Sequence, residues 1–293
     1  MQRQRPKRGQ NGRGTTATPA DERAMSFLHL NPRPSKPRTR GITEIRGPYY
    51  SSYGTRHLED VFETMGAYVD SLKFAGGSFA LMPRRVVKRI VDLCHENDVA
   101  VSTGGFIELV LTQGHDAVER YVDECAELGF DVIELSSGFI TTSLETQLRL
   151  IERVTRAGMK AKPEIGIQFG AGGASTPEEL EAEGTRDLDC VIGQARQFLD
   201  AGAYMIMIES EGITESVNAW RTDVPAKFAS ALGLERLMFE AADPPVFEWY
   251  VKNFGPDVNL FVDHSQIVQL ECLRSGVWGT KSTWGRVRGY APS

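Results

Sequence analysis

The stretch Leu128-Gly129-Phe130-Asp131-Val132-Ile133-Glu134-Leu135 shows how this chain passes from helix to strand. Upstream of it, apolar side chains recur with a period near 3.6 residues over 117–128, which predicts a helix with one buried stripe. Gly129 suits the left-handed conformation at the end of a helix. Residues 132–135 have the pattern of a short buried strand. The stretch therefore predicts a helix, a glycine turn and a strand, with a carboxylate at the end of the strand.

After Gly41 the chain alternates short strands with helices in eight units, with strand starts about 31 residues apart. Strands are expected at 42–46, 69–74, 99–103, 132–135, 160–165, 204–209, 236–239 and 258–262. Helices are expected at 58–65, 84–97, 117–128, 144–157, 187–201, 226–232, 245–254 and 267–275. This alternation predicts the α/β class and a single (β/α)8 TIM barrel. A doubly wound sheet would have a G-x-G-x-x-G turn after its first strand, but Arg46-Gly47-Pro48-Tyr49-Tyr50 follows there.

The first 40 residues differ in composition from the rest of the chain. They contain ten Lys/Arg and two acidic residues, a net charge of +8, which leaves −14 for the remainder of a chain whose total is −6. Such a segment buries little apolar surface, so residues 1–40 are expected to be a disordered basic arm and residues 41–293 the barrel domain. The acidic remainder argues against a nucleic-acid partner. A transit peptide is the alternative for the arm, although residues 1–24 show no amphipathic apolar face.

The overall composition is that of a soluble globular protein, with 41% hydrophobic and 25% charged residues. No stretch approaches the roughly 18 consecutive apolar residues of a membrane helix, so no membrane partner is expected. The four cysteines are scattered and are expected to be buried and reduced, which indicates a reducing compartment and a cytoplasmic protein. They are Cys94, Cys125, Cys190 and Cys272. A homo-oligomer stays open as a further possibility.

Polar side chains stand at the ends of the predicted strands. They are Glu44, Arg46, Lys73, Thr103, Glu134, Glu164, Glu209, Glu240, Asp263 and His264. Active sites of this barrel type lie at the C-terminal ends of the strands. Glutamates at the ends of buried strands cost stability unless they bind something. The sequence therefore predicts a carboxylate-rich pocket at this end of the barrel.

Converging carboxylates repel one another unless a cation neutralises them. Oxygen ligands without clustered Cys or His favour Mg²⁺ over zinc. We expect Glu164 and Glu209 to bind the metal with the help of Glu240 or Glu134. Lys73 and Arg46 supply positive charge for an anionic, phosphoenolpyruvate-like substrate. Catalytic roles are expected for Lys73, Glu134 and Glu164, and the general acid is either Lys73 or a carboxyl of raised pKa; a Schiff base at Lys73 is the alternative.

Small residues at the same end of the barrel let backbone N–H groups approach an anion. Gly76 and Gly77 follow the second strand, and Gly104 and Gly105 follow the third, so all four are expected to bind substrate. His264 and Ser265 begin the final helix, where an N-terminus suits phosphate. They are expected to bind substrate as well, with a cap or a rim hydrogen bond as the alternative for His264.

The chain after Gly41 resembles the phosphosulfolactate synthase family. The resemblance rests on LKFAGGS (72–78), STGG (102–105), LGFDVIE (128–134), PEIG (163–166), MIE (207–209), MFEA (238–241) and VNL (258–260). It implies a TIM barrel that catalyses the Mg²⁺-dependent addition of sulfite to phosphoenolpyruvate, through an enolate-like intermediate. The product implied is (2R)-phospho-3-sulfolactate, a precursor of coenzyme M.

Within this family the chain is most similar to a eukaryotic branch typified by plant heat-stress-associated proteins. Residues TEIR (43–46), KP (162–163) and VDHSQI (262–267) carry that similarity. Archaeal members carry an acidic residue where Arg46 stands, basic residues at Ile167-Gln168 and an arginine at Ser210-Glu211. Fewer positive charges weaken the binding of a trianion by roughly 1 to 3 kcal/mol per charged hydrogen bond. The resemblance thus leaves open a related nucleophile, or a non-catalytic stress protein that acts through protein contacts.

Overall fold

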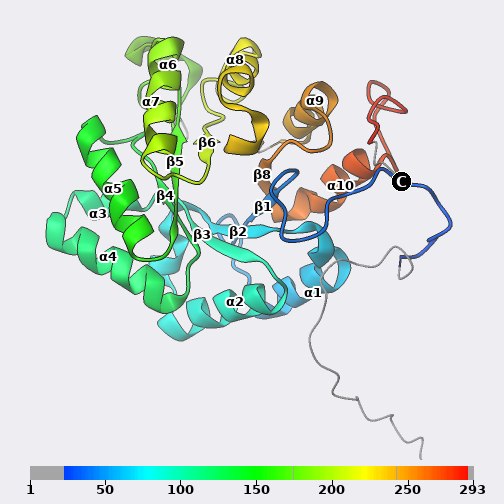
Figure 1. Cartoon of the computed structure of the whole chain (residues 1–293), viewed down its shortest axis with the longest axis horizontal. Coiled ribbons are helices and arrows are strands. Elements are labelled where there is room, and N and C mark those ends of the chain that lie inside the picture. The colour runs from blue at the N-terminus through cyan, green and yellow to red at the C-terminus, as the bar shows by residue number, and fades with distance from the viewer. Residues whose placement is uncertain (1–22, 174, 242, 290–293) are drawn as a thin grey trace, which may run out of the picture.

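The computed structural model describes residues 23–173, 175–241 and 243–289, and these residues form a closed parallel barrel ringed by helices (Figure 1). Each strand pairs with the next, and the first pairs with the eighth. The strands are β1 (Thr43–Arg46), β2 (Ser71–Phe74), β3 (Ala100–Thr103), β4 (Val132–Leu135), β5 (Lys160–Ile165), β6 (Ile206–Ile208), β7 (Leu237–Glu240) and β8 (Leu260–Asp263). The predicted TIM barrel is confirmed.

Helices connect the strands and cover the outside of the barrel. They are α1 (Thr55–Met65), α2 (Arg84–Glu96), α3 (Ile107–Leu111), α4 (His115–Leu128), α5 (Leu144–Arg156), α6 (Pro177–Glu183), α7 (Leu188–Asp200), α8 (Asp223–Leu232), α9 (Pro244–Phe254) and α10 (Ile267–Ser275). The short helices α3 and α6 were not predicted. The sequence did carry a signal for α6, because Thr176 and Glu179 form a capping box at its start.

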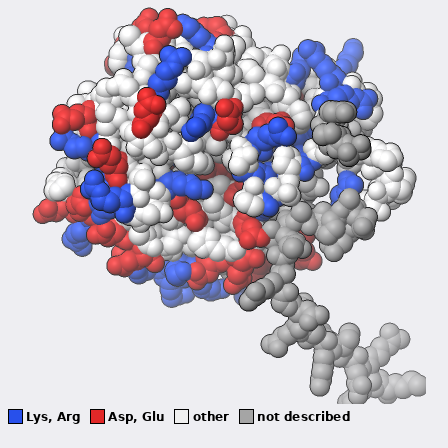
Figure 2. All heavy atoms as spheres, viewed as in Figure 1, with Lys and Arg blue, Asp and Glu red and all other residues white. Residues whose placement is uncertain are grey.

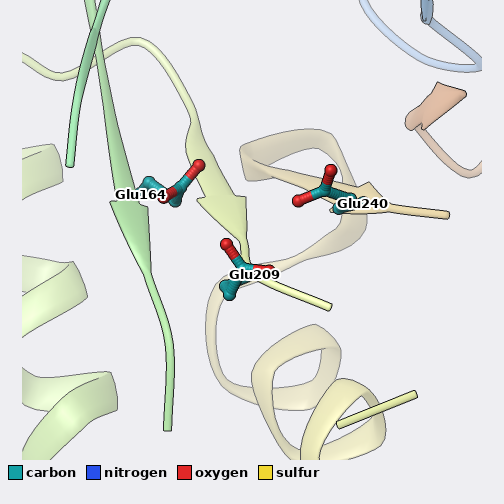
Figure 3. A group of neighbouring side chains, drawn as sticks. All are labelled: Glu164, Glu209 and Glu240. Atoms are coloured by element: carbon teal, nitrogen blue, oxygen red, sulfur yellow. The ribbon is translucent and has the colours of Figure 1, made fainter. Parts of the chain in front are cut away.

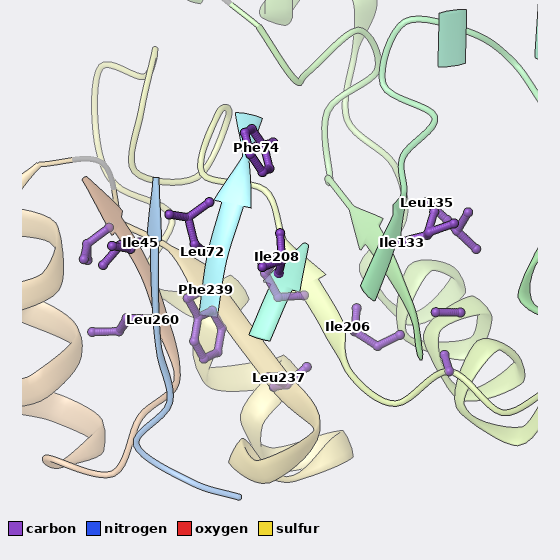
Figure 4. Packing of buried hydrophobic residues seen from close by; sticks show 14 of the residues in the cluster. Ile45, Leu72, Phe74, Ile133, Leu135, Ile206, Ile208, Leu237, Phe239 and Leu260 are labelled. Atoms are coloured by element: carbon purple, nitrogen blue, oxygen red, sulfur yellow. The ribbon is translucent and has the colours of Figure 1, made fainter. Parts of the chain in front are cut away.

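Side chains alternate between the two sides of the barrel wall. Outward-facing apolar side chains such as Ile45, Ile133 and Phe239 pack against the helices in one large core (Figure 4). Residues of opposite parity face inward, where Met207, Met238 and Phe261 form a smaller apolar cluster. Near the C-terminal ends of the strands the inward-facing positions are polar. The alternation therefore gives each strand one apolar face and directs its charged groups into the barrel.

A glycine ends α4 at the predicted place. Gly129 follows α4 with φ +91° and has the left-handed conformation, in which its N–H bonds the carbonyl groups of Cys125 and Ala126. Any other residue would be strained there. The next element, β4, can therefore begin three residues later.

Residues 31–41, which we call the strap, lie along the N-terminal ends of the strands. Arg33 bonds Glu271 of α10 at 2.8 Å, and Arg38 bonds Asp70, next to β2, at 2.9 Å. Residues 31–40 belong to the arm that was predicted to be disordered, but the structure places them against the barrel. The reason is that Arg33 and Arg38 form ion pairs with carboxylates of the barrel. Residues 1–22 of that arm lie outside the described residues.

The surface helices carry mixed charge. Lys and Arg lie among Asp and Glu over α4 and α5 (Figure 2), where Arg153 bonds Glu119 and Asp123. All four cysteines are free, as expected, and Cys94 and Cys125 are buried. Cys190, which is exposed, and Cys272, which is half-buried, correct the expectation of burial. Among the described residues, no helix has the length and apolarity needed to cross a membrane.

Candidate active site

A cavity of about 770 Å³ opens at the C-terminal ends of the strands. Its floor and inner wall come from strand ends, and its outer wall comes from the segments that follow β1 to β6. The lining includes two basic residues, Arg46 and Lys73, and seven glutamates. The glutamates are Glu108, Glu134, Glu164, Glu209, Glu211, Glu215 and Glu240. The predicted carboxylate-rich pocket is therefore present, and negative charge predominates in it.

Glu164, Glu209 and Glu240 form a compact acidic cluster. They come from β5, from the residue after β6 and from β7, and their carboxylates point toward one another (Figure 3). One oxygen from each lies within 4.8 Å of the others. The three hard oxygen donors suit a divalent cation such as Mg²⁺. Of the two helpers predicted for Glu164 and Glu209, the structure brings Glu240 into the cluster and Glu134 into a different set of contacts.

The closeness of the three carboxylates is electrostatically unfavourable. Burial raises the pKa of Glu164 well above its usual range, and the charges of Glu134 and Glu209 add to the effect. Burial, with the charge of Glu240 next, raises the pKa of Glu209 to about 8. The pKa of Glu240 is raised by burial too, against the opposing effect of Lys73 and Arg46. Carboxylates that resist ionisation in this way gain from a bound cation, so the electrostatics of the cluster fit a metal.

A chain of alternating charges crosses the barrel beneath this cluster. The Lys73 ammonium donates to both carboxylate oxygens of Glu134, at 3.0 and 3.1 Å. Lys162 Nζ lies 3.3 Å from Glu134 Oε2 and 2.5 Å from Glu44 Oε2, and Ser71 donates to the other Glu44 oxygen. All these side chains are buried. Two lysines and two glutamates thus balance one another, and they hold Lys73 toward the cavity.

The protonation states follow from these contacts. Burial would raise the pKa of Glu134, but Lys73 and Lys162 hold it below its usual value. For Lys73, burial acts to lower the pKa, yet Glu134, Glu240 and other carboxylates hold it above the ordinary lysine value. Lys73 therefore keeps its proton at neutral pH. A Schiff base would need the neutral amine, so the structure favours Lys73 as a fixed cation over the alternative nucleophile.

Arg46 lies between the acidic cluster and the outer wall. Its Nη2 is 3.2 Å from Glu240 Oε1, and its guanidinium carbon lies 4.7 Å from the centre of the Tyr50 ring and 5.1 Å from that of Phe261. Its Nε is buried and has no hydrogen-bond partner among the described residues. Arg46 thus brings a positive charge to the lining of the cavity.

The four predicted glycines lie at the mouth but differ in what they face. Gly76, Gly104 and Gly105 line the cavity, whereas Gly77 does not. A Cβ on Gly76 would meet the Tyr49 ring at 2.4 Å, and one on Gly77 would meet the Phe106 ring at 2.1 Å. These two glycines therefore make room for aromatic rings.

His264 and Ser265 do not reach the cavity. The imidazole of His264 packs beside α1, with ring centres 4.6 Å from Tyr53 and 5.1 Å from His57. The N–H and hydroxyl groups of Ser265 both donate to Asp263 Oδ1. The expected phosphate site is not assembled here, because a carboxylate of the chain already occupies the helix N-terminus.

Two buried carboxylates of the mouth were not predicted as functional. Glu108 of α3 accepts the N–H groups of Gly138, Phe139 and Ile140, and so holds the loop after β4. Glu211 accepts N–H groups from the loop after β5, namely those of Gly172, Gly173 and Ser175. No local signal marks these roles, since each partner lies about 30 or more residues away in the chain.

The comparisons with known proteins agree with this geometry. The family model "(2R)-phospho-3-sulfolactate synthase (ComA)" matches residues 31–280. The chain is 42% identical over 262 residues to the Arabidopsis thaliana protein HEAT-STRESS-ASSOCIATED 32, which covers 86% of this chain and 92% of that protein. It is 30% identical over 271 residues to phosphosulfolactate synthase of Methanothermobacter thermautotrophicus, covering 90% and 98%.

Solved structures show the fold alone. A putative fructose-1,6-biphosphate aldolase from Coccidioides immitis superposes with a TM-score of 0.54 at 16% identity, covering 85% of this chain and 86% of that one. At this identity the likeness concerns the barrel and carries no information on the reaction.

Proposed function

We propose that this chain, which belongs to the (2R)-phospho-3-sulfolactate synthase family, is a Mg²⁺-dependent lyase that adds sulfite or a related nucleophile to phosphoenolpyruvate. The observation that carries the proposal is the cluster of Glu164, Glu209 and Glu240 beside Lys73 and Arg46 in one cavity. These three glutamates would hold the metal. When bound, the Mg²⁺ would supply a Lewis acid for the oxygens of an enolate-like species.

The side chains of the cavity would bind and orient the substrate. Lys73 and Arg46 would donate to its phosphate and carboxylate, since both line the cavity and Lys73 keeps its proton. Glu134 would act as a positioning residue, because it holds the Lys73 ammonium through two hydrogen bonds. In the addition, the sulfur of sulfite bonds C3 of phosphoenolpyruvate, the π electrons move toward the carboxylate, and C2 then takes a proton.

Two kinds of group in the cavity carry a proton for C2 at neutral pH. One is the Lys73 ammonium, and the other is a protonated carboxyl of the acidic cluster, where burial and repulsion raise the pKa values. A carboxyl that binds the metal gives up its proton. With Mg²⁺ in place, this favours Lys73 as the donor.

Calorimetric titration with Mg²⁺, followed by phosphoenolpyruvate, tests the proposal. We expect saturable binding of both, sulfite-dependent loss of phosphoenolpyruvate, and a 10- to 100-fold loss of metal affinity or activity in Glu164→Gln. Glu178→Gln, on the exposed side of α6, is the matched control and should behave as the wild type. If neither ligand produced heat, and if Glu164→Gln behaved as the wild type, an enzymatic role would be contradicted.

A second function, protein binding in a stress response, is favoured by a specific observation. The relative with 42% identity is named for heat stress, and the cavity holds seven glutamates against two basic residues, an imbalance that disfavours a trianion. Under this second proposal, the barrel acts through contacts with other proteins. The second proposal would gain support if neither ligand bound in calorimetry and another protein still remained bound to the purified chain.

A further inference from the structure

The outer part of the cavity is apolar, unlike its floor. Four exposed side chains form what we call the collar: Tyr49, Tyr50, Leu109 and Phe139. Tyr49 and Tyr50 come from the loop after β1, Leu109 from α3 and Phe139 from the loop after β4. Tyr50 is 74% exposed and Phe139 is 65% exposed, although both line the cavity. Large apolar side chains gathered around a pocket mark a binding surface.

Two glycines leave room for two of the collar rings. A Cβ on Gly76 would lie 2.4 Å from the Tyr49 ring, and one on Gly173 would lie 2.6 Å from the Phe139 ring. Any other residue at either glycine would displace the ring. The rings therefore occupy defined positions against neighbouring loops.

A buried carboxylate fixes the Phe139 loop. Glu108 accepts the N–H groups of Phe139 and Ile140 at 2.7 and 3.0 Å, and its other oxygen accepts that of Gly138. A loop ordered in advance loses less entropy when a ligand binds. The collar thus has the preorganisation of a ligand site.

The cavity is larger than the proposed substrate needs. Phosphoenolpyruvate has ten non-hydrogen atoms and fills at most roughly 300 Å³ if each takes the volume of one water molecule. The cavity holds about 770 Å³. A small substrate bound to the charged floor would therefore leave the collar without a contact.

Arg46 joins the charged floor to the collar. It contacts Glu240 on one side and the Tyr50 ring on the other, and it lines the cavity. An acid group bound to Arg46 would direct the remainder of the molecule along Tyr50 toward the collar.

We propose that the collar is a second subsite, which binds an aromatic or branched apolar substituent of the substrate. The substrate class is then a relative of phosphoenolpyruvate, an enol or 2-oxo acid that carries such a substituent. Its acid group would lie on the floor and its apolar part between Tyr50, Leu109 and Phe139. This inference rests on the proposed function, because the floor must bind the acid group.

Competition calorimetry with phenylpyruvate and pyruvate, at a fixed Mg²⁺ concentration, tests the subsite. Phenylpyruvate should bind at least about tenfold more tightly than pyruvate, since its ring is removed from water. Phe139→Ala and Leu109→Ala should each weaken phenylpyruvate binding roughly three- to tenfold and leave pyruvate binding unchanged. Phe169→Ala is the control, because Phe169 is equally exposed but does not line the cavity.

Three results would overturn the subsite. Equal affinity for the two acids is one, and an equal effect of Phe169→Ala is another. The third is a change of oligomeric state in the collar variants, measured by light scattering, without a change in phenylpyruvate affinity, which would make the collar a contact between copies. Failure of the proposed function differs from all three, because phosphoenolpyruvate itself would then not bind. Unchanged melting temperatures verify that the variants are folded.

Discussion

At the scale of single residues, the acidic cluster shows how neighbours decide the chemistry of a side chain. Glu134 is a buried glutamate and Glu164 a half-buried one, both near strand ends, yet their pKa values shift in opposite directions. Two lysines lie beside Glu134, whereas carboxylates surround Glu164. Glu134 stays ionised and holds Lys73, whereas the ionised form of Glu164 would be stabilised by a bound cation. Identical residue types in similar positions thus take different roles.

Glu209 provides a pH test of this electrostatic picture. Its pKa in the folded protein is about 8, raised from 4.5, so the stability it contributes is present below pH 4.5 and is lost as the pH rises through 8. Without metal, the free energy of unfolding should fall between these pH values. Glu209→Gln should flatten that slope and be more stable than the wild type at pH 8 by roughly 1 to 3 kcal/mol. Urea unfolding across the pH range measures both.

The control for this pH test is Glu178→Gln, which alters an exposed glutamate of α6. Its slope should follow that of the wild type. If Glu209→Gln followed it as well, Glu209 would not be the source of the pH dependence.

Lys162, like Glu108 and Glu211, has a role that was not predicted. It lies two positions before Glu164 in β5, so the alternation of the strand places both on the inward face. That two-residue spacing could have indicated that Lys162 faces inward. The sequence could not have indicated its partners, because Glu44 is 118 residues away in the chain.

At the scale of elements, the strap shows that amino-acid composition does not by itself predict which side chains are in contact. Its arginines match the basic arm in composition, but the Arg38 and Asp70 side chains are only 3% and 9% exposed in their ion pair. Arg38 also donates to the carbonyl groups of Pro34 and Ala67. The strap is thereby tied to the turn before β2, at the end of the barrel opposite the cavity.

Arg38→Met should destabilise the protein by about 3 kcal/mol, because it leaves a buried carboxylate without its charged partner. Arg40→Met is the matched control. Arg40 pairs with Asp257 at 3.3 Å, but the two side chains are 66% and 40% exposed, so the loss should stay below about 1 kcal/mol. Urea denaturation of the two variants compares them directly. Equal losses would mean that the Arg38 ion pair does not anchor the strap.

At the scale of the whole molecule, strand pairing in the folded barrel assembles the acidic cluster. Its glutamates come from β5, β6 and β7 or the residues next to them, and these strands are distant in the chain but pair as neighbours in the sheet. A metal that binds there binds the folded chain and not the unfolded one. Metal affinity and global stability are therefore linked.

Mg²⁺ should accordingly raise the melting temperature of the protein. At a free concentration of 100 times Kd it adds about 2.7 kcal/mol to the free energy of unfolding. The gain should grow from pH 6 to pH 8, because the raised pKa values of Glu164 and Glu209 make protons compete with the metal. Thermal unfolding at several Mg²⁺ concentrations measures the effect. A shift of the same size in Glu240→Gln would place the ion elsewhere.

By itself, the sequence determined the barrel, its strand order, the family and the three glutamates at one end. Hydrophobic periodicity, glycines after helices and glutamates at strand ends are local features, and the rule that TIM-barrel sites lie at the C-terminal ends of strands unites them. Only the tertiary structure decided that Lys162 joins Glu44 to Glu134, that His264 and Ser265 stay outside the cavity, and that Gly76 seats a tyrosine ring. The physical reason is that long-range strand register and loop packing set which side chains meet, and neither is written in local spacing.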